Sequence, residues 1–217
     1  MKTLMMIFFT SLAIGFTGAV MPGPLLAVAL KESLSRGRTS ALWLSAGHSL
    51  CELVMVGALA AGVARFVSVD ALAGPVGLLG GAILVWMGIG AFRQVASGRA
   101  VVNERSSPAR VHSLLLDGAA VTIANPYWLV WWLTAGLALA LFAGKAGMVG
   151  IIVFYVGHIT ADFLWYGLVG ILAGSGRHAL EGKLYGHAIR ACGGFLLVFG
   201  LLFIVYGGKL VHSRIIQ

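Results

Sequence analysis

Two acidic residues lie inside strongly apolar stretches of the chain, each one helical turn after a histidine. Glu52 follows His48 by four residues and Asp162 follows His158 by four, so each imidazole shares a helix face with a carboxylate. Such a pair can relay protons, because histidine titrates near neutral pH and a carboxylate removed from water binds a proton more readily. It can also bind an ammonium group or a metal ion directly.

Neither acid is expected to face lipid, because an ionised carboxylate at the centre of a membrane helix costs about 2.5–3.5 kcal/mol. No Lys or Arg lies within one helical turn of Glu52 or Asp162 to neutralise it. We therefore predict that both side chains face the interior of a helix bundle. A lone buried histidine is usually a packing residue, but the repetition of the pair favours a functional role.

Two other apolar stretches are interrupted by proline, at Pro22-Gly23-Pro24 and at Asn125-Pro126. Proline removes a backbone donor and disfavours helical angles in the preceding residue, so both breaks free backbone polar groups. At membrane depth such groups are tolerated inside the protein or along a polar cavity. One proline kink can serve packing alone, whereas two at matched positions predict a shared central site. A half-helix that starts at such a break presents its free amides and the positive end of its dipole, which together attract a carboxylate.

The stretches that carry these residues are long and apolar. Of 217 residues, 59% are hydrophobic and 10% are charged, whereas about 25% are charged in a water-soluble domain. A bilayer core requires about 20 apolar residues per helix. Six spans meet this requirement: Leu4 to Leu30, Thr39 to Val67, Leu72 to Phe92, Leu114 to Phe142, Gly147 to Ala173 and Ile189 to Tyr206.

The formal net charge is +8, and most basic residues lie in the connections after the first, third and fifth spans. This asymmetry predicts a multi-pass protein of the cell membrane with both termini outside. The basic connections already have a partner in the lipid bilayer, so no nucleic-acid partner is expected. Glu32, between Lys31 and Arg36, is expected to be a solvated loop charge.

The chain contains an internal duplication. A Gly-His-x3-acid segment occurs in the second span and again, 110 residues later, in the fifth. Because each half holds an odd number of spans, the second half must enter the membrane from the opposite side. We predict an all-α integral membrane protein whose six transmembrane helices form two inverted three-helix repeats. The repeats comprise residues 1–97 and 113–217, joined by a basic cytoplasmic loop at 98–112.

These features resemble the LysE/RhtB-type amino-acid exporter family. The resemblance covers almost the whole chain and rests on Met21-Pro22-Gly23-Pro24, Arg36-Gly37, Gly47-His48 to Glu52, and Asn125-Pro126-Tyr127-Trp128. It implies export of amino acids or related small solutes, driven by proton or ion exchange, without a bound cofactor. Many members have lysine or another residue after the Asn-Pro pair, so the identity of the solute stays open.

We expect the substrate or ion to bind among Pro22, Gly23, Pro24, His48, Glu52, Asn125, Pro126, Trp128, His158 and Asp162. Trp128 and its aromatic neighbours could hold a cation against their rings or simply pack. The alternative function is a divalent metal exporter, in which His48, Glu52, His158 and Asp162 would bind the ion. No H-E-x-x-H or G-x-S-x-G motif occurs, so an enzyme is not expected. The chain can act alone or as a homo-oligomer.

Overall fold

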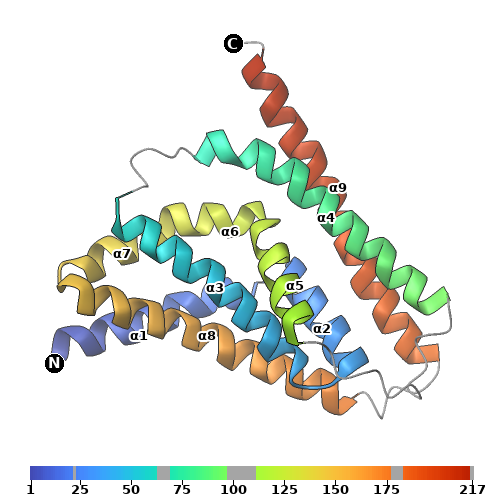
Figure 1. The fold of residues 1–217 in the computed structure, drawn as a ribbon, viewed down its shortest axis with the longest axis horizontal. Coiled ribbons are helices and arrows are strands. Elements are labelled where there is room, and N and C mark those ends of the chain that lie inside the picture. Colours follow the sequence, from blue (N-terminus) through green and yellow to red (C-terminus); the bar gives the residue numbers. More distant parts are fainter. Residues whose placement is uncertain (22, 63–68, 97–110, 177–182, 216–217) are drawn as a thin grey trace.

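The computed structural model describes residues 1–21, 23–62, 69–96, 111–176 and 183–215. Within these ranges every regular element is a helix. Pro22 and residues 98–110 of the predicted basic loop lie outside the described residues, and the last two residues of that loop already belong to a helix. Figure 1 shows the arrangement of the helices.

Six helical stretches are long and apolar enough to cross a membrane, which confirms the predicted all-α membrane fold. The helices are α1 (Lys2–Ala19), α3 (Ser40–Ala60), α4 (Val69–Ala96), the segment from α6 (Pro126–Trp131) to α7 (Leu137–Gly144), α8 (Gly147–Gly176) and α9 (Lys183–Ile215). Two shorter helices, α2 (Pro24–Arg36) and α5 (Val111–Ile123), complete the described part of the chain.

The first predicted span is two helices rather than one. Helix α1 ends at Ala19, and Gly23 has an extended backbone (φ −154°, ψ 178°) directly before α2. Pro24 occupies the first position of α2, where its missing N–H removes no helical hydrogen bond. The span predicted to end at Leu30 therefore continues as helix to Arg36.

The second break has the same design. Asn125 is extended (φ −98°, ψ 103°), and its side-chain oxygen accepts a hydrogen bond of 3.1 Å from the backbone N–H of Tyr127, which caps α6. Pro126 is the first residue of that helix. One π-helical turn, Trp132–Gly136, then leads into α7. Figure 1 shows α5 and α6 meeting at a sharp bend.

Helices α3 and α8 contact each other in the main body of the bundle, where α1 packs against α8 and α5 against α3. Helices α4 and α9 form an antiparallel pair beside this body (Figure 1). Glycines allow the closest approaches: a Cβ on Gly47 would collide with the backbone of Leu115, and one on Gly118 with the backbone of Leu44. Small residues at such contacts let membrane helices pack backbone to backbone.

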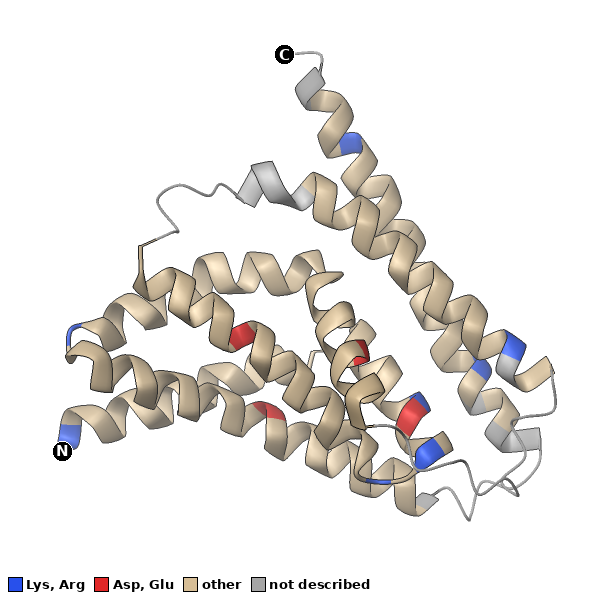
Figure 2. Cartoon of the chain, in the orientation of Figure 1, with Lys and Arg blue, Asp and Glu red and all other residues tan. Residues whose placement is uncertain are grey.

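Figure 2 shows a group of Lys and Arg at the end of the bundle away from the N-terminus, with others beside the N-terminus and towards the C-terminal end of α9. Glu32 differs from the prediction of a solvated loop charge, because it is only 3% exposed. Its carboxylate lies 2.8 Å from both the Lys31 Nζ and the Arg36 Nε. The prediction was wrong because α2 continues past Glu32 and turns it towards the bundle.

Candidate functional site

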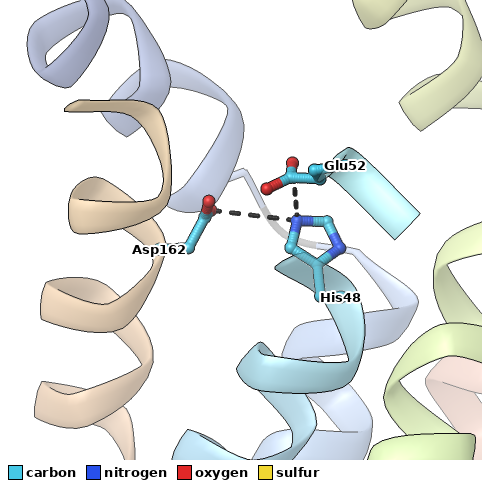
Figure 3. A group of neighbouring side chains, drawn as sticks. All are labelled: His48, Glu52 and Asp162. Atoms are coloured by element: carbon cyan, nitrogen blue, oxygen red, sulfur yellow. Dashed lines mark ion pairs between the residues drawn. The ribbon is translucent and has the colours of Figure 1, made fainter. Parts of the chain in front are cut away.

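The two His-acid pairs predicted from the sequence meet in the structure. Glu52 Oε1 lies 3.0 Å from Nε2 of His48 on its own helix and 3.0 Å from Nε2 of His158 on α8. Asp162 lies further off, with carboxylate oxygens 3.9 Å from each histidine Nε2. Figure 3 shows the carboxylates of Glu52 and Asp162 both approaching the same nitrogen of His48, which is Nε2. Helices α3 and α8 thus form one four-residue cluster.

The cluster lies in the interior of the bundle. Glu52 is 1% exposed, Asp162 2%, His158 3% and His48 9%. Two acids removed from water and from lipid require polar partners, and the two imidazoles provide them. One proton on either histidine would give the cluster a charge-assisted hydrogen bond.

Thr122 on α5 is a member of this network that the sequence did not indicate. Its hydroxyl oxygen lies 2.7 Å from His48 Nδ1, and the hydroxyl donates to the Gly118 carbonyl at 2.7 Å. A threonine near the end of an apolar helix usually makes only the second of these bonds. Its contact with a histidine 74 residues away depends on the packing of α5 against α3.

Aromatic rings enclose the other histidine. The ring centroids of Trp131 and Trp132 lie 4.8 Å and 5.0 Å from that of His158, and Phe154 lies 6.3 Å away. Both tryptophans come from the segment after the second helix break. The imidazole is therefore held in an aromatic pocket, where a protonated ring would also gain cation–π attraction.

A cavity of about 330 Å³ opens beside the cluster. Of the predicted site residues, its lining includes Gly23, Pro24, His48, Glu52, Asn125, Trp128, His158 and Asp162. Pro126 is buried but does not line the cavity, and Pro22 lies outside the described residues. Both helix breaks and both His-acid pairs therefore border one space.

Other lining residues carry weaker signals in the sequence. Tyr166 lies one helical turn beyond Asp162, so its position on the same face of α8 could have been inferred. Phe199 and Phe203 extend the wall from α9. Their apolar surroundings resemble those of any membrane helix, so nothing in the sequence distinguishes them.

Several buried polar atoms at this cavity have no hydrogen-bond partner among the described residues. They are Glu52 Oε2, Asp162 Oδ2, His158 Nδ1 and the indole nitrogens of Trp128 and Trp132. Buried polar groups are usually satisfied, so such a group needs an explanation. A polar ligand in the cavity could supply the missing partners.

The donor set also has the chemistry of a metal site. Ligand atoms of His48, Glu52 and Asp162 all lie within 4.8 Å of one another. Imidazole and carboxylate together suit borderline divalent ions such as zinc.

Six helices that are long and apolar enough to cross a membrane define the chain as a multi-pass membrane protein. Residues 16–207 match the model of the LysE type translocator family, so the chain belongs to that family, as the sequence predicted. LysE type translocators are membrane transporters, and the chain is therefore a transporter with a small-molecule substrate in a lipid bilayer.

The chain is 26% identical over 196 residues to the chemotactic transduction protein ChpE of Pseudomonas aeruginosa. That match covers 90% of this chain and 95% of ChpE. No solved structure matches the chain.

Proposed function

We propose that this protein exports an amino acid or a related small amine-bearing solute from the cell by secondary transport, in exchange for a proton or another ion. The observation that carries the proposal is that two helix breaks and two buried acids border a single cavity. Broken helices around a central site are a recurring arrangement in secondary transporters.

The charges at the cavity favour a cationic group. Glu52 and Asp162 line it, and none of the described lining residues is Lys or Arg. Each acid has one carboxylate oxygen without a hydrogen-bond partner among the described residues. A substrate ammonium could bind both oxygens, and the rings of Trp131 and Trp132 would add cation–π attraction.

The opposite end of an amino acid also finds suitable partners. The α2 helix begins at the cavity with Pro24 and Leu25, and its first amides have no partner within the helix. The positive end of that helix dipole attracts a carboxylate. The indole N–H groups of Trp128 and Trp132 could donate to the same carboxylate, because both nitrogens are buried and neither has a hydrogen-bond partner in the described part of the chain.

The helix contacts support an inverted repeat of residues 1–97 and 113–217. In this repeat α1 corresponds to α5, α2 to the segment from α6 to α7, α3 to α8, and α4 to α9. The contacts then occur in matched pairs: α1 with α8 matches α5 with α3, α2 with α9 matches α6 with α4, and α2 with α3 matches α7 with α8. Exchanging the two halves interchanges the members of each pair. We infer that the halves rock around the cavity in alternating access. Both termini lie outside in this proposal, because the basic connections belong in the cytoplasm.

Counterflow of radiolabelled solutes into proteoliposomes tests the proposal. Wild-type protein should exchange at least one member of an amino-acid and amine panel, and Glu52→Gln and Asp162→Asn should each reduce this exchange to background. Asp117→Asn is the matched control, because Asp117 is a half-buried acid of α5 that does not line the cavity.

The outcomes separate the alternatives. If Glu52→Gln and Asp162→Asn both keep pH-dependent export near the wild-type rate, the proposed coupling is wrong. If purified protein binds and transports zinc but no amino acid or amine, the function is the divalent metal export considered from the sequence.

A further inference from the structure

The Thr122 hydroxyl makes two short contacts, one of them with a ring nitrogen of His48. A hydroxyl has a single hydrogen, and that of Thr122 is used in the 2.7 Å bond to the Gly118 carbonyl. The contact of 2.7 Å between Thr122 Oγ1 and His48 Nδ1 therefore needs a hydrogen from the imidazole. The two contacts together favour the tautomer of His48 that is protonated on Nδ1.

This constraint affects the other side of the ring. His48 Nε2 lies 3.0 Å from Glu52 Oε1. If the only proton of the ring is on Nδ1, then Nε2 and an ionised Glu52 are two acceptors facing each other. A hydrogen bond at this distance needs one more proton, carried either by Nε2 or by the carboxyl group. A proton shared between His48 and Glu52 would satisfy this contact.

Helix α1 takes the same place beside His158 on α8 that α5 takes beside His48 on α3. Leu44 and Phe154 each lie four residues before a histidine. Gly118 of α5 packs against the backbone of Leu44, and Ser11 of α1 donates a 2.6 Å hydrogen bond to the carbonyl of Phe154. Gly118 and Ser11 thus occupy equivalent places.

One helical turn further along, the residue that faces His48 differs from the residue that faces His158. Thr122 follows Gly118 by four residues and contacts His48, whereas Gly15 follows Ser11 by four and lies beside His158. A Cβ on Gly15 would lie 2.9 Å from His158 Nδ1. Glycine provides no hydroxyl, and this Nδ1 has no hydrogen-bond partner among the described residues.

We propose that Thr122 is a positioning residue that keeps His48 protonated on Nδ1 and so makes the His48–Glu52 pair hold the proton exchanged during transport. Gly15, in the equivalent place, leaves His158 without this constraint. The second part of the inference rests on the proposed function, because it assigns the shared proton to ion exchange. The first part concerns the free protein and can be tested without any substrate.

The titratable groups that line the same cavity or bond to α3 around His48 are Glu52, Tyr127, Tyr155, His158, Asp162 and Tyr166. His158 bonds the same oxygen of Glu52 as His48 does, at 3.0 Å. Asp162 lies 3.9 Å from His48 Nε2. All of these groups remain in a Thr122 variant, so a change in the tautomer of His48 would be due to the lost hydroxyl.

The first experiment is ¹⁵N NMR of histidine-labelled, purified protein, with His48→Gln used to assign the His48 signals. Wild type and Thr122→Ser should show a protonated Nδ1 at every pH. In Thr122→Val the acceptor for Nδ1–H is lost, and neutral His48 can place its proton on Nε2, facing ionised Glu52. Nδ1 of His48 should then lose its proton at neutral pH.

The second experiment measures the pH profile of solute counterflow. In Thr122→Val, neutral His48 can direct its single proton towards ionised Glu52, which stabilises the cluster after the shared proton has left. The shared proton should therefore dissociate at a lower pH than in wild type. The midpoint of the profile should therefore move towards acid by about one unit, the equivalent of one charge-assisted hydrogen bond. Thr122→Ser should restore the wild-type midpoint.

Thr160→Val is the matched control, because Thr160 on α8 makes the same kind of hydroxyl-to-carbonyl bond, at 2.6 Å to Val156, and does not line the cavity. It should change neither the tautomer nor the pH profile. An unprotonated Nδ1 in wild type, or an unchanged tautomer in Thr122→Val, would overturn the role of Thr122. A changed tautomer with an unchanged pH profile would overturn its link to transport. Absence of transport by wild type for every solute would contradict the proposed function and leave the NMR result to decide the role of Thr122.

Discussion

Glu52 of α3 and His158 of α8 are 106 residues apart in the chain and share a 3.0 Å hydrogen bond. The same carboxylate oxygen lies 3.0 Å from His48, whereas Asp162 lies 3.9 Å from both histidines. Glutamate is one methylene longer than aspartate, so the two acids are not equivalent even though they occupy matched positions. Glu52 Oε1 lies within hydrogen-bond distance of both imidazoles and Asp162 of neither, although each acid keeps one oxygen without a partner among the described residues.

We predict that Glu52 and His158 stabilise the contact between α3 and α8 jointly. Glu52→Ala and His158→Ala should each destabilise the protein, because each leaves a buried polar partner unsatisfied. Their double variant should lose less than the sum of the single losses, with a coupling of about 1–3 kcal/mol. Denaturant titration of the protein in detergent micelles measures all three. Losses that add to within about 0.5 kcal/mol would show that the two residues do not interact.

The close approach of α3 and α5 should not tolerate a side chain at Gly47. A Cβ there would collide with the backbone of Leu115, which cannot move aside as a flexible side chain could. We expect Gly47→Ala to destabilise the protein by about 1–3 kcal/mol or more and to reduce its yield. Gly57→Ala on the same helix is the control, because nothing lies within 4 Å of the added Cβ. The control should be neutral or slightly stabilising, since alanine favours helix. Equal effects of both changes would contradict the packing.

The indole nitrogen of Trp132 is predicted to bind substrate. Trp132 is fully buried and lines the cavity, and its Nε1 has no partner among the described residues. Trp132→Phe keeps an aromatic ring and removes the donor, so we expect affinity for the transported solute to fall by about five- to tenfold, the value of one hydrogen bond. Equilibrium binding to the purified protein measures this change. Trp86→Phe, at a side chain that is 71% exposed, should leave affinity unchanged. A Trp132→Phe variant with wild-type affinity would exclude the indole from the site.

Glu32, the buried acid of α2, should stabilise the folded protein although it does not line the cavity. Glu32→Gln removes the partner of both Lys31 and Arg36, so we expect a loss of about 1–3 kcal/mol in the free energy of unfolding. Arg36→Gln should cost less than about 1 kcal/mol, because that side chain is 36% exposed. Thermal unfolding in detergent ranks the two variants. The reverse ranking would mean that Glu32 is not held by these pairs.

The helical spans and the positions of their breaks were largely predictable from local features of the sequence. Apolar length indicates the spans, and proline position indicates the breaks before Pro24 and Pro126. The spacing of four residues indicates that each acid shares a helix face with its histidine. These features depend on one helix at a time, since the bilayer requires each span to satisfy its own backbone.

Contacts between helices depend on the tertiary structure alone. The pairing of His158 with Glu52, the bond from His48 to Thr122 and the burial of Glu32 each need a particular distance and rotation between helices. Glycine contacts such as those of Gly47 set these distances, but many of the 31 glycines look alike in the sequence. The sequence thus determines which chemical groups enter the membrane and on which helix face. Only packing decides which of them form hydrogen bonds with one another, because a hydrogen bond is lost when its atoms move apart by less than an ångström, whereas helix patterns repeat every turn.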